Sequence, residues 1–171
     1  MVAVALIGAV AALYLGSRTH RITSTKASNN SKLSAAPRLQ AVDLEGRNID
    51  TAAYSGKVML INFWAAWCTP CADEIPQFVS LQDKFGPRGF QAIGISMDDK
   101  ERALRDFYHK YKMNYPVIVG NQQIAQEYGG ILGLPTTLII GRDGRIHSKQ
   151  QGLADFPRLQ LEIGDLLNAG N

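Results

Sequence analysis

The 171-residue sequence predicts an α/β fold built on a mixed central β-sheet with helices on both faces. Two observations predict it. Short apolar runs, suited to buried strands, alternate with longer segments of helical periodicity, and this alternation favours parallel strands joined by crossover helices. The last two strand-like runs are instead separated by a glycine-containing turn at residues 141–145, which is typical of a hairpin. Part of the sheet is therefore expected to be antiparallel.

Composition supports a folded domain and excludes some partners. The chain is 46% hydrophobic, enough to bury a substantial core. Residues 1–36 carry four basic residues and no acidic one, whereas the rest carries 14 basic and 15 acidic residues. The globular part is therefore nearly neutral and has no basic stripe, so we expect no nucleic-acid partner.

The chain begins with an apolar run from Val2 to Leu15 that has no polar face. Such a run predicts a membrane anchor or signal segment over residues 1–16. The run lacks both a basic n-region and a small-residue cleavage site, which favours an uncleaved anchor. It is shorter than the roughly 20 residues of a full span, and the basic residues after it would retain the domain in the cytoplasm. A natural start upstream, carrying a basic n-region, would reconcile these observations.

Residues 17–36 are rich in small and polar residues and predict a flexible linker. A domain is expected over residues 37–171. Its first part, residues 38–50, alternates apolar and polar residues around a turn, as in a short hairpin or two edge strands. The continuous apolar run from Val58 to Phe63 then predicts a strand buried on both faces.

The later elements follow from periodicity and breakers. A helix is expected from Ala72 to about Phe85, with Pro76 inside it, and a second buried strand over residues 90–96. Asp98 and Asp99 are candidate caps for a helix ending near residue 112. The remaining elements are expected in this order: strand 116–119, helix 122–128, strand 136–140, strand 146–151 and a helix from 156 to about 167.

The chemistry is carried by Cys68-Thr69-Pro70-Cys71, placed between a buried strand and the first turn of a helix. The positive end of the helix dipole lowers the pKa of the leading thiol. We therefore expect Cys68 to be the attacking thiol at an exposed helix start and Cys71, further inside, to be the resolving thiol. This pattern indicates thiol–disulfide exchange.

Two simpler interpretations of this cysteine pair are less favoured. A zinc site needs four ligands, and the three histidines do not have ligand spacing to the two cysteines. A purely structural disulfide closing so short a loop gains little stability. We expect no metal and no cofactor besides the Cys68–Cys71 pair.

The motifs resemble known families. Trp67 to Cys71 and Leu134-Pro135-Thr136 resemble the thioredoxin superfamily, and residues 62–68, 74–76 and 133–137 look like its TlpA/ResA-like branch. The similarity covers residues 37–168 in element order. It implies a thioredoxin fold with an inserted helix and strand near residues 100–128.

The resemblance also implies a function. Members of this branch are membrane-anchored bacterial thioredoxins whose domains lie outside the cytoplasm. They reduce disulfides of exported proteins, often the haem-attachment cysteines of apocytochromes c. We therefore expect exported disulfide-bearing proteins as substrates, a membrane thiol donor of electrons, and a monomer.

The resemblance assigns roles to two further polar residues. Asn62 occupies the position at which cytosolic thioredoxins have a buried Asp, and it cannot titrate. Glu74 lies three residues after Cys71, on the same side of the helix. Our hypothesis is that Glu74 is desolvated, has a raised pKa and exchanges protons with Cys71. The alternative is an ordinary solvated helix glutamate.

Other positions are implied in substrate binding and tuning. By resemblance, Pro135 is expected to be cis and to face the disulfide, with the backbone of Leu134 pairing with substrate and Thr136 alongside. Trp67 is expected at the rim of this surface. Between the cysteines, Thr69 and Pro70 add no charge that would stabilise a thiolate, which favours a reducing couple.

Three other functions are weighed against the reductase. A peroxiredoxin-like antioxidant peroxidase would need a threonine three residues before its reactive cysteine, whereas Thr69 follows Cys68. A redox-inactive docking module usually loses a cysteine, and both are present. A DsbA-like oxidase usually carries a helical insertion of its own, for which this chain has little room.

Overall fold

A computed structural model describes residues 34–98 and 101–169. Its strands are β1 (Gln40–Val42), β2 (Asn48–Asp50), β3 (Val58–Trp64), β4 (Phe90–Ser96), β5 (Val117–Val119), β6 (Thr136–Ile140) and β7 (Ile146–Gln151). Its helices are α2 (Thr69–Phe85), α3 (Glu101–Lys110), α4 (Gln122–Glu127) and α5 (Phe156–Asn168), with short 3-10 turns at Thr51–Tyr54 and Gly86–Arg88. The element order is the predicted one, and the boundaries agree within a few residues.

The central sheet is mixed, as predicted. Its strand order is β5-β4-β3-β6-β7, with β3 parallel to β4, β4 parallel to β5, and β6 antiparallel to both β3 and β7. All seven residues of β3 and all five of β6 are buried. Since side chains alternate between the faces of a strand, these two strands supply apolar side chains to a core on each side of the sheet.

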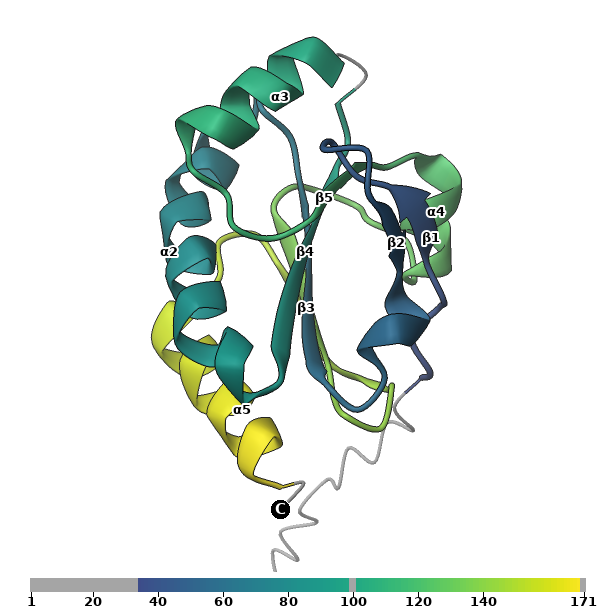
Figure 1. The fold of residues 1–171 in the computed structure, drawn as a ribbon, viewed down its shortest axis with the longest axis vertical. Helices are drawn as coiled ribbons and strands as arrows, with labels where there is room; N and C mark the ends of the chain where they lie inside the picture. Colours follow the sequence, from purple (N-terminus) through teal and green to yellow (C-terminus); the bar gives the residue numbers. More distant parts are fainter. Residues whose placement is uncertain (1–33, 99–100, 170–171) are drawn as a thin grey trace, which may run out of the picture. The chain divides into compact units, whose positions relative to one another are not determined.

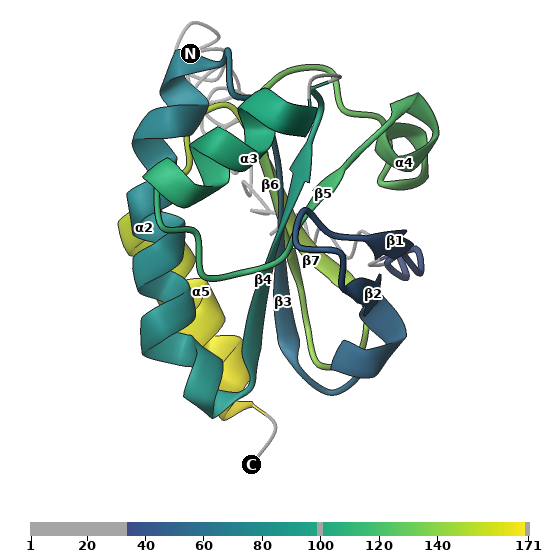
Figure 2. The same ribbon diagram turned by 45° about the horizontal axis from the view of Figure 1, so that its top comes forward.

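Different elements cover the two faces (Figures 1 and 2). Helices α2, α3 and α5 lie on one side, where they enclose the larger core, which includes Trp64, Phe78 and Ile163. The β1–β2 hairpin and α4 lie on the other side, over a core that includes Phe63 and Tyr128. Helices therefore occur on both faces, as expected for the thioredoxin fold.

The segment before β3 reaches both edges of the sheet. Ala35 forms an antiparallel bridge with Arg145 beside β7, and Asp43 forms one with Ile118 in β5. The N–H of Ala36 also donates to the carbonyl of Gly144 over 2.9 Å. Each bridge covers backbone groups of an edge strand that would otherwise be free to pair with another chain.

This arrangement corrects the predicted linker boundary. Residues 34–36 have the small, polar composition of the preceding segment, but they hydrogen-bond to the β6–β7 hairpin: the N–H of Ile146 donates to the carbonyl of Ser34 over 2.9 Å. Composition did not reveal this because the contacts use only backbone groups. The predicted segment 1–16 and the linker up to residue 33 lie outside the described residues. Within residues 34–98 and 101–169, no helix is long and apolar enough to cross a membrane.

Candidate active site

The two cysteines lie where a buried strand passes into a helix. The chain leaves β3 at Trp64, and Cys68 is the N-cap of α2, its carbonyl accepting the N–H of Ala72 over 3.1 Å. Cys68 and Cys71 form a disulfide with an S–S distance of 2.00 Å. Pro70 lies in the first turn of α2, where its missing N–H removes no helical bond. The predicted placement of the motif is confirmed.

One part of that prediction is wrong: Cys68 is not exposed. Cys68 is 5% exposed and Cys71 is 1% exposed. In the disulfide form both cysteines belong to the larger core cluster, against which Leu134 and Ala66 also pack. Of the four motif residues, only Thr69 and Pro70 are exposed.

The backbone just before the cysteines is held by a carboxylate. The N–H of Ala66 donates to Asp98 Oδ2 over 2.6 Å, and the hydroxyl of Ser96 donates to the same oxygen over 2.9 Å. Ser96 is the fully buried last residue of β4. The carboxylate of Asp98, predicted from the sequence to cap the next helix, thus positions the loop that leads into Cys68. Asp99 lies outside the described residues.

Glu74 is buried one turn after Cys71. It is 3% exposed, and its Oε1 accepts the N–H of Ala154 over 2.5 Å. Its other oxygen, Oε2, is buried without a hydrogen-bond partner among the described residues. Burial raises the pKa of Glu74, while the Ala154 hydrogen bond opposes that rise. The predicted desolvation and raised pKa are confirmed, and the alternative of a solvated glutamate is excluded.

Asn62 lies in the middle of β3 and is 2% exposed. Its Nδ2 donates to the hydroxyl of Thr137 on β6 over 3.2 Å. The Asn62 side chain carries no charge. Among the described residues, the buried carboxyl group near the cysteines is therefore that of Glu74 on α2. As expected, the strand has an amide at Asn62 and the helix has an acid at Glu74.

The loop before β6 has the predicted conformation at its proline. The Leu134–Pro135 peptide bond is cis. The carbonyl of Pro135 accepts the N–H of Gly152 over 2.8 Å, and the hydroxyl of Thr136 donates to the carbonyl of Gly133 over 2.7 Å. This loop is therefore tied both to itself and to the loop between β7 and α5.

A lysine holds the other end of the same loop. Lys149 Nζ donates to the carbonyls of Tyr128, Gly129 and Gly130, at 3.2, 3.1 and 2.6 Å. These carbonyls follow the C-terminus of α4, where a cation is favourable. The chain between α4 and Pro135 is thus fixed at both ends.

Exposed apolar side chains stand on three loops at this end of the sheet. Trp67, next to Cys68, is 71% exposed; Leu132, before the cis-proline, is 89% exposed; and Leu153, between β7 and α5, is 60% exposed. The large exposed hydrophobic residues elsewhere in the described ranges are Val42, Val119 and Leu161. An apolar surface around a disulfide fits the binding of polypeptide. Leu132 and Leu153 were not predicted from the sequence, because isolated loop leucines have no periodic signal.

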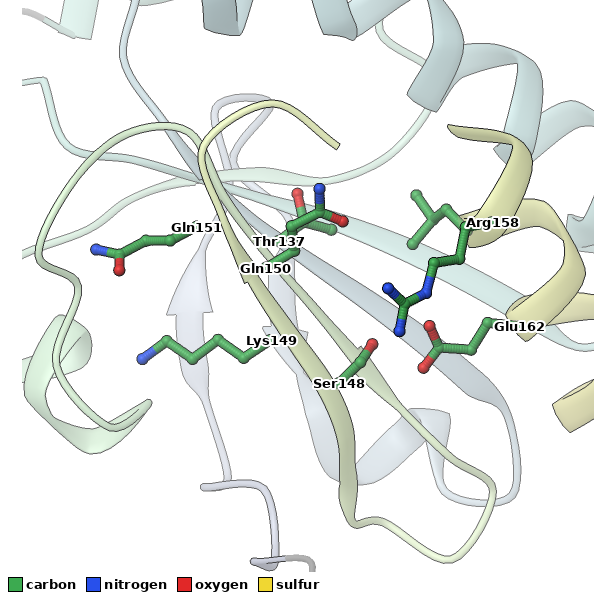
Figure 3. Close-up of a pocket in the computed structure, with 8 residues that line it drawn as sticks. Thr137, Ser148, Lys149, Gln150, Gln151, Arg158 and Glu162 are labelled. Carbon is green, nitrogen blue, oxygen red and sulfur yellow. The ribbon is translucent and has the colours of Figure 1, made fainter. Parts of the chain in front are cut away.

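The structure also contains a groove of about 310 Å³ between β7 and α5 (Figure 3). Ser148 and Gln150 lie on the side of β7 that faces α5, and Arg158 and Glu162 approach from that helix, whereas Gln151 lies on the opposite side of the strand. The sequence analysis did not single out this groove. Gln150, at its edge, contacts the loop that donates to Glu74.

Comparisons with known proteins agree with this geometry. The AhpC/TSA family model matches residues 33–149. The thiol-disulfide oxidoreductase ResA of Bacillus thuringiensis strain Al Hakam is 33% identical over 128 residues, which is 74% of this chain and 72% of the relative. ResA of Bacillus thuringiensis subsp. konkukian is 32% identical over 118 residues, 68% of each chain.

A solved structure shares the fold. The thioredoxin-family thiol:disulfide interchange protein of Chlorobium tepidum superimposes with a TM-score of 0.74 at 26% identity, over 79% of this chain and 97% of that protein. Family, sequence relatives and fold thus agree with a Cys68–Cys71 disulfide at the start of α2. The chain belongs to the AhpC/TSA family of the thioredoxin superfamily and is a ResA-like thiol–disulfide oxidoreductase.

Proposed function

We propose that this enzyme reduces disulfides of exported polypeptides outside the cytoplasm, with Cys68, Cys71 and Glu74 as the catalytic residues. The observation that carries the proposal is the buried Glu74 carboxyl one turn beyond Cys71, whose Oε2 has no hydrogen-bond partner within the part of the chain that the structure describes. A carboxyl group whose pKa is raised by burial, next to a buried thiol, is suited to exchange a proton with that thiol.

In the proposed reaction the reduced enzyme supplies two electrons. The Cys68 thiolate attacks one sulfur of a substrate disulfide, which forms a mixed disulfide and releases the other substrate sulfur as a thiolate. Cys71 passes its proton to Glu74 and attacks the Cys68 sulfur. The Cys68–Cys71 disulfide forms and the substrate leaves with both of its sulfurs reduced. Its two thiolates take up one proton from Glu74 and one from solvent. A membrane dithiol then returns two electrons to the enzyme.

The surroundings of the pair support a polypeptide as substrate. Trp67, Leu132 and Leu153 supply exposed apolar contact area on three loops. The backbone of Leu134 is proposed to pair with an extended substrate chain. Pro135 and Thr136 are buried at the start of β6, so they are proposed to shape the loop that carries Leu134. Thr69 and Pro70 add no positive charge beside the thiolate, consistent with a reducing couple.

Membrane attachment is proposed for residues 1–16, on the strength of the apolar run in the sequence. Apocytochrome c is proposed as one substrate within the exported class. Two measurements test the location: alkaline extraction of membranes, and labelling of the reduced cysteines in intact cells with a thiol reagent that does not cross the membrane. Retention in the membrane together with labelling is expected. Labelling only after lysis would contradict the proposed side of the membrane.

The direction of electron flow is tested by a redox titration of the full-length chain in dithiothreitol and glutathione buffers, with thiol trapping and mass analysis. A midpoint near or below about −270 mV, the thioredoxin value, is expected for a reductant. A midpoint near about −120 mV, the value of a strong oxidase, would reverse the proposed direction.

A peroxidase is not favoured by the site. The residue three positions before Cys68 is Ala65, which is fully buried and has no hydroxyl to bind a peroxide. The same preparation should therefore turn over disulfide substrates much faster than hydrogen peroxide. Faster peroxide turnover would instead favour the peroxidase.

A further inference from the structure

The peptide group between Leu153 and Ala154 is hydrogen-bonded on both sides. Its N–H, on Ala154, donates to Glu74 Oε1 over 2.5 Å. Its carbonyl, on Leu153, accepts from Gln150 Nε2 over 2.6 Å. Because a trans peptide group is planar, its N–H and carbonyl point in opposite directions. Fixing the carbonyl therefore also fixes the direction of the N–H.

Gln150 holds this loop at a second point. Its Oε1 accepts the N–H of Asp155 over 3.5 Å, so one side-chain amide contacts the peptide groups on both sides of Ala154. Asp155 in turn caps α5 by accepting the N–H of Arg158 over 3.2 Å. The loop begins at Gly152, which has a φ of 83° and donates its N–H to the carbonyl of Pro135. The loop thus has fixed ends, and Gln150 sets the orientation of the peptide group between them.

The position of Gln150 in β7 makes this contact possible. It pairs with Thr137 across the strands and lies on the side of β7 that faces α5, whereas Gln151 lies on the other side (Figure 3). Gln150 is partly buried and Gln151 is exposed. The described residues show no hydrogen bond from the Gln151 side chain, so this neighbour is a matched reference.

We propose that Gln150 is a positioning residue of the active site, which aims the Ala154 N–H at the Glu74 carboxyl through one peptide group. The inference deepens the proposed function, since it concerns the environment of the same glutamate. Hydrogen bonds in series polarise one another, so the donation by Gln150 also strengthens Ala154 as a donor. Gln150 thereby stabilises the ionised form of Glu74 against the effect of burial.

Other charged groups do not account for this effect. The elements packed against Glu74 bring Cys71 on its own helix, Asp155 in the loop and Arg158 on α5. Cys71 is held in the disulfide, and the side chains of Asp155 and Arg158 are exposed, where solvent screens them. The pKa of Glu74 is set by burial, which raises it, and by the Ala154 hydrogen bond, which lowers it.

The test is a titration of the Glu74 side-chain carboxyl by carbon-13 NMR in the oxidised full-length protein, without substrate. Glu74→Gln identifies the resonance. Gln150→Met removes both hydrogen bonds at nearly constant volume, and Gln151→Met is the matched control. We expect the titration midpoint of Glu74 to be higher in Gln150→Met than in the wild type and unchanged in Gln151→Met. The Ala154 amide proton should exchange roughly tenfold faster or more in Gln150→Met alone.

An unchanged Glu74 midpoint in Gln150→Met would overturn the proposal, as would an equal rise in both variants. If Gln150→Met does not fold, Gln150→Thr replaces it, because threonine suits a strand but is too short to reach the Leu153 carbonyl. The readout needs no catalysis, so it is independent of whether Glu74 acts on Cys71. That question is answered separately by the Cys71 thiol titration in Glu74→Gln.

Discussion

The N–H of Ala66 and the carboxylate of Asp98 lie 2.6 Å apart and join the loop before Cys68 to the end of β4. The same carboxylate oxygen accepts the hydroxyl of Ser96, and the N–H of Asp98 returns a bond to that hydroxyl over 3.2 Å. The loop that leads into the redox motif is thus fixed by Asp98, just beyond the next strand of the chain, β4. Four predictions follow from this and the other contacts of the site.

Replacing Asp98 should loosen the motif. Asp98→Ala leaves the Ala66 N–H and the Ser96 hydroxyl without their shared acceptor, at an expected cost of about 1–3 kcal/mol in the free energy of unfolding. Asp98→Asn retains an acceptor and should cost less. Urea unfolding of the oxidised proteins measures both. Equal stabilities for wild type and Asp98→Ala would show that the contact contributes nothing.

Glu74 should make stability depend on pH in an unusual direction. Burial raises its folded pKa above the ordinary 4.5, so the folded state holds the proton more tightly than the unfolded state. Proton binding by Glu74 therefore contributes its full amount to the free energy of unfolding below about pH 4.5. This contribution is lost as the pH rises through the folded pKa. Glu74→Gln removes this loss, and the variant should be the more stable protein above that pKa.

Denaturant unfolding of the oxidised protein across this pH range measures the effect. Asp73→Asn is the matched control, since Asp73 is an exposed neighbour on the same helix. Its replacement should leave the Glu74 component intact. If wild type and Glu74→Gln lost stability in parallel as the pH rises, the buried carboxyl would not be its source.

An acid at position 62 should be costly at neutral pH. In Asn62→Asp a carboxylate replaces a 2% exposed amide that donates to Thr137. Ionising it in this site is unfavourable, so the variant should lose about 1–3 kcal/mol of unfolding free energy, with the loss growing as pH rises. Asn62→Ala should show a loss that does not change with pH. The same pH-independent loss in both variants would contradict a buried charge at this position.

The apolar loops should matter for large substrates only. Leu132→Ser or Leu153→Ser removes a side chain that is 89% or 60% exposed in the free protein. If a polypeptide covers part of it, each change should cost about 1 kcal/mol, or roughly a fivefold loss of kcat/KM, mainly through KM. Reduction of a small aromatic disulfide should stay unchanged. Leu161→Ser, on α5, is the control, and an equal loss there would show that the effect is not local to the site.

Several features of this protein were determined by local sequence. The apolar run at residues 58–63 specifies a strand, Gly86 ends a helix, and the turn at residues 141–145 specifies a hairpin. Each depends only on residues close in sequence, and the structure agrees. The place of Cys68 at a helix start follows from the same patterns. The expected burial of Glu74 came instead from the family resemblance, and the structure agrees with it.

Other features depend on packing between distant parts of the chain. Ala154 and Glu74 are 80 positions apart, and the Asp98 and Ala66 contact spans 32 positions. No periodicity links such pairs, because helix and strand patterns correlate only residues a few positions apart. The burial of Cys68 and the bridging of Ala35 to Arg145 are of the same kind. The sequence therefore determined which groups are candidates for the chemistry and on which elements they lie. The tertiary structure decided which backbone groups hold them, because only folding brings those donors and acceptors within hydrogen-bonding distance.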